Sequence, residues 1–392
     1  MSRRFSFHRA LAATLALGGC NVALDAPLAP EGPAATTPTV AAMFELIGGY
    51  RLGVDYASEG LAIVPDAQGF AQALVGGAHA HQRGAHLYEL PGAPGPGNDV
   101  NAYPLVVPTR TWSVATLYPR WMEGQTLRDL AVVPAPGGFA LAGIGRVFYN
   151  TSPRASTQIN VREVRAGDYA LGSTREVAVP LPEQEFTGFI KHEDRTQDLT
   201  AIGGGAYDSG QGSVGGLSYA VQGADGVWRR RLTPPSFGDL ASPRLPRDSA
   251  YSCPEGPSWV CIPPVNGKGV WSTERIGGGG VRIGNTIVFI ATLGYGPRTY
   301  ARQSYTFGDP AQDRAVAYFF QQDPATQAVT LAAYDRWTFA QPGELVIGVA
   351  RGRLRGVNEP VLFVATSMAW APSAGAGKVG TVVHAFRITA GG

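Results

Sequence analysis

Short apolar runs rich in β-branched and aromatic residues recur along the chain, separated by turns rich in glycine and proline. The 392 residues include 52 glycines and 30 prolines, which interrupt the apolar runs and form no Gly-X-Y period. We find no convincing amphipathic helix of twelve or more residues, so the pattern predicts an all-β fold. The clearest predicted strands are 60–64, 72–75, 85–90, 130–133, 139–143, 159–164, 199–202, 217–221, 281–283, 286–292, 315–320, 345–350, 360–366 and 381–388.

The predicted strands repeat loosely as a unit. An apolar strand and a turn lead to a second strand ending in Gly or Ala, and a third strand follows a variable loop. The candidate third strands are 86–90, 160–164, 217–221, 317–320 and 384–388. Their spacing is irregular and longer than the period of WD or kelch blades, but it still suits a propeller with insertions between strands. We therefore expect a β-propeller of five or six blades with a loop-rich insertion in the middle. A pair of β-sandwiches is the competing fold, but it needs two cores and a linker, and no composition shift indicates one.

Propellers commonly close by joining the two ends of the chain in one blade. We therefore expect residues 379–388 to complete a blade with the first strand, near 46–54.

The first twenty residues look like a bacterial lipoprotein signal peptide. Basic residues Arg3, Arg4 and Arg9 precede a short apolar run, and Leu17-Gly18-Gly19 leads to Cys20. The resemblance implies removal of residues 1–19 and acylation of Cys20, including palmitate, in an exported outer-membrane lipoprotein that faces the periplasm or the cell surface. An ordinary signal peptide, with Cys20 incidental, is the alternative.

The charge of the chain argues against nucleic acid as a partner. Without residues 1–19 the chain keeps 29 basic and 30 acidic residues, and its clearest basic run is Arg229-Arg230-Arg231. Residues 20–42 comprise the lipidated cysteine and a flexible tether rich in Ala, Pro and Thr, and residues 43–392 form the single propeller domain. The expected partners are therefore the membrane, through the lipid, and an unidentified small ligand, glycan or envelope protein.

The remaining cysteines, Cys253 and Cys261, lie in a loop rich in Pro and Gly. In an exported protein such a local pair predicts a disulfide that closes this loop and stabilises it by no more than about 2–3 kcal/mol.

Several stretches together resemble a group of uncharacterised, secreted, propeller-like bacterial proteins. They are 58–63, 73–77, 87–91, Trp271 with 276–280, 287–296 with Tyr300, 334–337 and 382–388. The likeness covers most of 45–388 and is clearest in the last third. The chain departs from the group at Gly76-Gly77-Ala78-His79, where Gly-His is usual, and in a longer cysteine-containing middle segment. The resemblance implies a propeller and export, and no activity.

Three of the six histidines lie within eight residues. On a strand, His79 and His81 would point the same way and could share a divalent metal, with His86 or a carboxylate completing the site. No Cys or HExxH-type motif fixes that geometry, so a polar loop is the alternative. A divalent metal is the one cofactor that we consider.

Acidic residues suggest a second kind of site, because propeller glycosidases place carboxylates around the central channel. A scattered set could lie there: Asp55, Glu59, Glu193, Asp208 and Glu274. Nothing in their spacing selects them over other acids. We expect the charged run 191–195, with Asp198, to be a solvated loop.

A glycine-rich segment is the preferred candidate for a ligand site. Consecutive glycines at 277–280 suit close backbone approach at the innermost strand of a blade, and no phosphate-binding motif follows them. The flanking residues that could reach a pocket mouth and bind sugars or carboxylates are Glu274, Arg275, Tyr295, Arg298 and Tyr300. Packing of turns is the structural alternative.

The function that we expect is ligand or partner binding by an anchored envelope propeller, without catalysis. The alternative is a carbohydrate-active enzyme, a glycosidase or lyase, that uses carboxylates in the channel. An envelope assembly factor is a third hypothesis, and it would expose a large apolar patch. No Gly-x-Ser-x-Gly elbow supports a serine hydrolase.

Overall fold

The computed structural model describes sixteen segments of the chain. They are residues 39–53, 60–78, 84–119, 126–147, 156–178, 188–191, 200–208, 212–222, 228–230, 279–293, 298–300, 303–305, 314–326, 329–337, 345–367 and 381–389. Neither of the two short α-helices in these segments, α1 (Val40–Met43) and α2 (Val114–Leu117), is long enough and apolar enough to cross a membrane.

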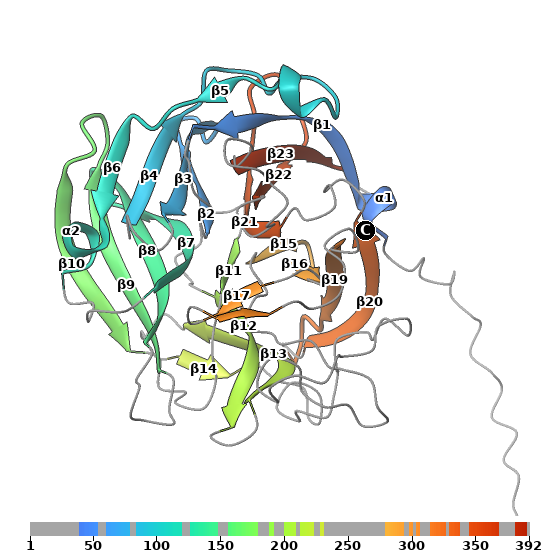
Figure 1. Cartoon of the computed structure of the whole chain (residues 1–392). Coiled ribbons are helices and arrows are strands. Elements are labelled where there is room, and N and C mark those ends of the chain that lie inside the picture. Colours follow the sequence, from blue (N-terminus) through green and yellow to red (C-terminus); the bar gives the residue numbers. More distant parts are fainter. Residues whose placement is uncertain are drawn as a thin grey trace, which may run out of the picture. The chain divides into compact units, whose positions relative to one another are not determined.

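The strands form a β-propeller, and the described segments contain five antiparallel blades (Figure 1). Blade 1 contains β2 (Leu61–Pro65), β3 (Ala71–Ala78), β4 (Gly84–Glu89) and β6 (Arg110–Ser113). Blade 2 contains β7 (Thr126–Ala135), β8 (Gly138–Val147), β9 (Ser156–Arg165) and β10 (Leu171–Ala178). Blade 3 contains β11 (Gly188–Lys191), β12 (Thr200–Asp208), β13 (Gly212–Gln222) and β14 (Trp228–Arg230).

Blade 4 contains β15 (Gly279–Ile283), β16 (Thr286–Leu293), β19 (Arg314–Gln322) and β20 (Val329–Trp337). Blade 5 contains β21 (Leu345–Gly352), β22 (Val361–Ser367), β23 (Thr381–Ile388) and β1 (Phe44–Leu52), with β5 (Leu105–Val106) added outside β1. A separate pair joins β17 (Arg298–Tyr300) to β18 (Gln303–Tyr305), and the 3-10 turn η1 spans Val100–Ala102.

The first strand of each blade lines the centre. Blades 3 and 4 form one continuous eight-stranded sheet, because β11 and β15 pair in parallel, Ile190 opposite Gly280. Contacts between neighbouring inner strands run from β2 to β7, β11, β15 and β21 and back to β2, which closes the ring. These five strands therefore form the innermost ring of the propeller.

The ring is closed by the two ends of the chain, as the sequence predicts. Strand β1 pairs antiparallel with β23 from Phe44 opposite Ile388 to Leu52 opposite Thr381. The strand that follows α1 is thus the fourth strand of blade 5, between β23 and β5.

The hydrophobic core consists of layers between neighbouring blades. In β2, for example, Leu61 and Ile63 face a layer shared with blade 5, whereas Ala62 and Val64 face a layer shared with blade 2. Apolar side chains on both faces explain why β2 is a continuous apolar run in the sequence.

Each of the fourteen predicted strands overlaps a strand of the structure, and each of the five predicted third strands is the third strand of its blade: β4, β9, β13, β19 and β23. The propeller prediction is confirmed, and the alternative of two sandwiches is wrong. The described strands form one five-stranded, two four-stranded and one eight-stranded sheet besides the β17–β18 pair, and dividing the eight-stranded sheet at the parallel pair of β11 and β15 gives the five blades. The predicted middle insertion falls on 231–278, outside the described residues.

Candidate functional site

A buried ion pair lies at the centre of the ring. Lys191, the last residue of β11, donates from Nζ to Oδ2 of Asp129 in β7. The Asp129 side chain is fully buried and that of Lys191 is 7% exposed. The pair therefore joins the innermost strands of blades 2 and 3.

The backbone around Asp129 is shaped for this carboxylate. A bulge shifts the register of β7 between Leu127 and Asp129, and such irregularities re-aim a side chain. Oδ1 of Asp129 accepts the N–H of Leu130 at 2.8 Å and that of Leu61, in blade 1, at 3.4 Å. Gly60 has φ +84°, and a Cβ there would lie 2.7 Å from the Cα of Asp129. One carboxylate thus links three inner strands, and glycine at position 60 permits the approach.

The electrostatics of the pair favour a structural role. Burial lowers the pKa of Lys191, and the charge and hydrogen bond of Asp129 oppose that shift. Both oxygens of Asp129 accept hydrogen bonds, Oδ2 from Lys191 and Oδ1 from the backbone. A carboxylate held in this way suits neither a general acid nor a nucleophile, because its oxygens are engaged and shielded.

The position of Lys191 corrects one prediction. The charged run from 191 to 195 was expected to be solvated, but Lys191 is buried because its partner Asp129 lies on the neighbouring inner strand. Residues 192–198 lie outside the described residues. Asp129 was missed, and its only local signal is an acid immediately before the apolar strand predicted at 130–133.

Most other predicted site residues lie outside the described part of the chain. These are Cys20, Asp55, Glu59, His79, His81, Glu193, Cys253, Cys261, Glu274, Arg275 and Tyr295. The proposed acylation, disulfide, metal and ligand sites therefore stay predictions. Within the described segments, no group of three or more His, Cys, Asp or Glu side chains could hold a metal ion.

Four predicted residues can be placed. His86 is buried in β4, its Nδ1 lies 2.9 Å from Oγ1 of Thr111, and burial lowers its pKa. Arg298 and Tyr300 begin and end β17, opposite Tyr305 and Gln303. Asp208 ends β12.

The glycine-rich segment behaves as expected where it is described. Gly279 and Gly280 are buried at the start of β15, and Gly280 pairs with β11 at the centre. The prediction that these glycines serve an innermost strand is confirmed for these two residues.

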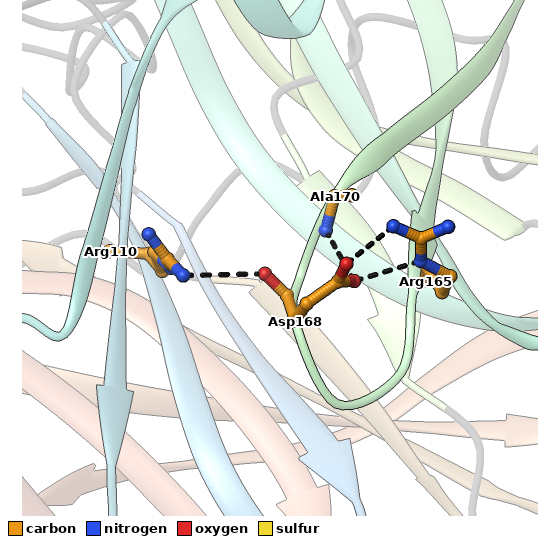
Figure 2. Close-up of polar contacts among 4 residues, drawn as sticks. All are labelled: Arg110, Arg165, Asp168 and Ala170. Atoms are coloured by element: carbon orange, nitrogen blue, oxygen red, sulfur yellow. Dashed lines mark hydrogen bonds and ion pairs between the residues drawn. The ribbon is translucent and has the colours of Figure 1, made fainter.

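A second polar cluster joins blades 1 and 2 at the turn between β9 and β10 (Figure 2). Asp168 accepts from Arg165 on both carboxylate oxygens, with a distance of 2.9 Å from Nε to Oδ1, and accepts the Ala170 N–H at 3.1 Å. These interactions, the Arg165 hydrogen bond foremost, lower the pKa of Asp168 to about 2. Arg110 of blade 1 donates to the carbonyl oxygen of Asp168 at 3.5 Å.

The residue after Asp168 extends this contact between blades. Tyr169 adopts φ +56°, the left-handed region that non-glycine residues seldom occupy, and its ring is buried. Its hydroxyl donates to Oε1 of Glu89 at 3.2 Å. The cluster therefore joins blades 1 and 2, and its ion pair between Arg165 and Asp168 is exposed at the surface.

No protein-family model and no curated protein sequence matches the chain. Among solved structures, it is similar to a GH32 β-fructofuranosidase from Bombyx mori, with 10% identity and a TM-score of 0.47 over 90% of this chain. The match spans 65% of that enzyme, less than two thirds of its length. An exo-1,5-α-L-arabinanase from a bovine ruminal metagenomic library has 9% identity and a TM-score of 0.41, covering 85% of this chain and 95% of that one. A GH43 endo-arabinanase from Bacillus licheniformis has 8% identity and a TM-score of 0.39, covering 86% and 96%.

Proposed function

We propose that the protein is an envelope lipoprotein whose rigid propeller binds a ligand or partner without catalysing a reaction. The ion pair between Asp129 and Lys191 carries the proposal. The five innermost strands contain one acidic residue, Asp129, and it is neutralised by Lys191 and held by backbone donors. Catalysis of glycoside cleavage uses two carboxyl groups that flank the scissile bond, so this centre supports rigidity and binding better than chemistry.

The anchoring part of the proposal rests on the sequence. Arg3, Arg4 and the apolar run before Leu17-Gly18-Gly19-Cys20 resemble a lipoprotein signal. Growth with a labelled palmitate analogue tests it: we expect label in the wild-type chain and none in Cys20→Ser. Equal labelling of the two chains would refute acylation at Cys20.

The ligand part is tested on soluble mature protein that carries Cys20→Ser. Its thermal unfolding is followed against divalent metals and a panel of oligosaccharides, because a ligand that binds the folded state stabilises it by RT ln(1 + [L]/Kd). A dose-dependent rise in Tm with one sugar would support glycan binding. A rise with a metal that His79→Ala/His81→Ala abolishes would assign the metal site. The absence of any shift would contradict a small ligand of these classes and favour a protein partner.

A carbohydrate-active enzyme is the second candidate function. The observation in its favour is that Asp129 places one carboxylate in an innermost strand, because glycosidases of this architecture use carboxylates around the central channel. The same soluble protein is incubated with a panel that includes 1,5-α-L-arabinan and a β-fructofuranoside. Sugar release that Asp129→Asn abolishes in a folded variant would overturn the non-catalytic proposal.

A further inference from the structure

The connection between β4 and β6 leaves blade 1 and lies along the outer edge of blade 5. We call residues 91–107 the strap. Within it, β5 pairs in parallel with β1, Leu105 opposite Arg51 and Val106 opposite Leu52. The sheet order places β1 between β23 and β5, so the strand that closes the ring is an interior strand (Figure 1).

Hydrogen bonds join the strap to β1 and the residue after it. The backbone bonds run from Gly49 N to Gly95 O (3.0 Å), Gly95 N to Gly49 O (2.9 Å), Arg51 N to Pro104 O (2.9 Å) and Gly53 N to Val106 O (2.8 Å). Two side chains of β1 add bonds to strap carbonyls: the Tyr50 hydroxyl to Gly92 at 2.8 Å and Arg51 Nε to Tyr103 at 3.0 Å. The outermost strand of a sheet has unpaired backbone groups, which proteins usually protect with charged residues or a covering segment. Here the backbone of the strap pairs with those groups of β1.

Two adjacent glycines of β1 are explained by the strap. Gly48 has φ +137°, and a Cβ there would lie 1.8 Å from the carbonyl oxygen of Gly95. A Cβ on Gly49 would lie 2.3 Å from the ring of Tyr103. That ring is buried, and its hydroxyl donates to the carbonyl of Gly97 within the strap at 2.9 Å. The two glycines of β1 therefore leave room for the strap.

The start of β1 is held from another side by blade 4 and the end of the chain. Phe44 stacks on Trp337 of β20, with ring centroids 5.2 Å apart. Thr389 donates from its N–H to the Met43 carbonyl at 3.0 Å and from its hydroxyl to the Ala42 carbonyl at 2.8 Å.

We propose that the strap is a clamp that prevents β1 from detaching from β23 and so keeps the ring closed. An antiparallel strand pulled at one end opens one pair of bonds after another. The strap bonds hold the second half of β1, from Gly49 onward, to the connection between β4 and β6, so detachment must break both sets. If the proposed anchoring is correct, β1 is also the strand through which tension on the tether enters the propeller, and the clamp resists that tension.

Hydrogen exchange of the β1 amides tests the clamp on soluble Cys20→Ser protein, whose result does not depend on acylation. Tyr103→Ala removes the ring that packs on Gly49. In a second variant, a four-residue Gly-Ser turn replaces residues 92–108. A short turn can make this connection because Thr109 N already bonds to Leu87 O, so the two ends of the deleted segment lie close together. The matched control, Leu105→Ser/Val107→Ser, changes two strap side chains that are each 59% exposed.

We expect Tyr103→Ala to accelerate exchange in β1 at least tenfold, with exchange in β9 of blade 2 unchanged, and the strapless variant to show a larger effect. The control should exchange like the parent. Parental exchange rates in β1 of both folded test variants would overturn the proposal. An equal acceleration in β1 and β9 would also overturn it, because that result indicates global destabilisation and not local opening.

Discussion

Removing Lys191 is expected to be among the most destabilising single changes in the propeller. Lys191→Met preserves much of the aliphatic stem but leaves the fully buried Asp129 carboxylate without its cation. Breaking a buried pair by removing one partner costs about 3–5 kcal/mol, because an uncompensated charge stays in the interior. That cost is a large part of the 5–15 kcal/mol by which typical domains are stable.

The double variant Asp129→Asn/Lys191→Met separates the charge from the packing. Asn can still accept the N–H of Leu130, now bonded at 2.8 Å, and the two opposite charges of the pair are removed together. We expect this variant to recover about 2 kcal/mol or more relative to Lys191→Met, as contacting residues show coupling energies of 0.5–3 kcal/mol. Urea denaturation of the four proteins of the cycle, followed by tryptophan fluorescence, measures the coupling.

The pH dependence of Asp129→Asn adds a test with a defined sign. Asp129 opposes the lowering of the Lys191 pKa by burial, so its removal lowers that pKa further. The unfolded state then binds more protons than the folded state between the lowered pKa and the ordinary Lys value near 10.4. Stability of Asp129→Asn relative to wild type must therefore rise as pH increases through this window and be lowest at the acid end.

Two outcomes would refute this account of the centre. If Lys191→Met unfolds within about 0.5 kcal/mol of wild type, the range of ordinary surface substitutions, the pair is not a buried cross-link. If the two single losses simply add in the double variant, the side chains do not interact. Tyr118→Phe is a suitable reference variant for the urea measurements, because it removes a different buried hydrogen bond. The Tyr118 hydroxyl donates to the Leu141 carbonyl at 3.2 Å.

Three further predictions follow from described contacts. In an NMR titration the Asp168 carboxyl should have a pKa of about 2 that moves toward 3.8 in Arg165→Gln; the same value in both proteins would contradict the assigned cause. Gly348→Ala should lower Tm markedly, because the new Cβ would lie 2.6 Å from the backbone of Gly60; an unchanged Tm would mean that blades 5 and 1 are less tightly apposed. Tyr50→Phe should lower the free energy of unfolding in urea by about 1 kcal/mol, because the Tyr50 hydroxyl donates to the Gly92 carbonyl. Tyr88→Phe should leave that free energy unchanged or raise it, since among the described residues the buried Tyr88 hydroxyl has no partner. A larger loss of stability in Tyr88→Phe than in Tyr50→Phe would contradict this reasoning.

Local patterns predicted the propeller because each blade repeats them. The third strand at 217–221, for example, places large apolar residues at every second position, and such a local pattern survives irregular spacing between blades. Strand β10 was missed, because Leu171–Ala178 mixes Gly, Ser, Thr and charged residues on an outer strand with little burial.

The central pair was not predictable in the same way. Asp129 and Lys191 are 62 positions apart and meet only because neighbouring inner strands are in contact. Lys191 begins a charged run, and such a run by itself predicts a solvent-exposed loop. The sequence pattern does not indicate that a residue has a partner in another blade. The strap was likewise hidden, since residues rich in Gly and Pro, such as 91–97, predict a loop and do not indicate which edge the loop covers.

The pairing of β1 with β23 has a consequence for the biogenesis of the protein. The ring cannot close until the last strand, Thr381–Ile388, has been synthesised, because its partner is the first strand of the domain. Contacts between residues so distant in sequence form slowly, and a chain lacking them exposes unpaired strand edges. Earlier blades can pair their own strands as they emerge, but the edge of β1 that pairs with β23 stays open until residues 381–388 are available.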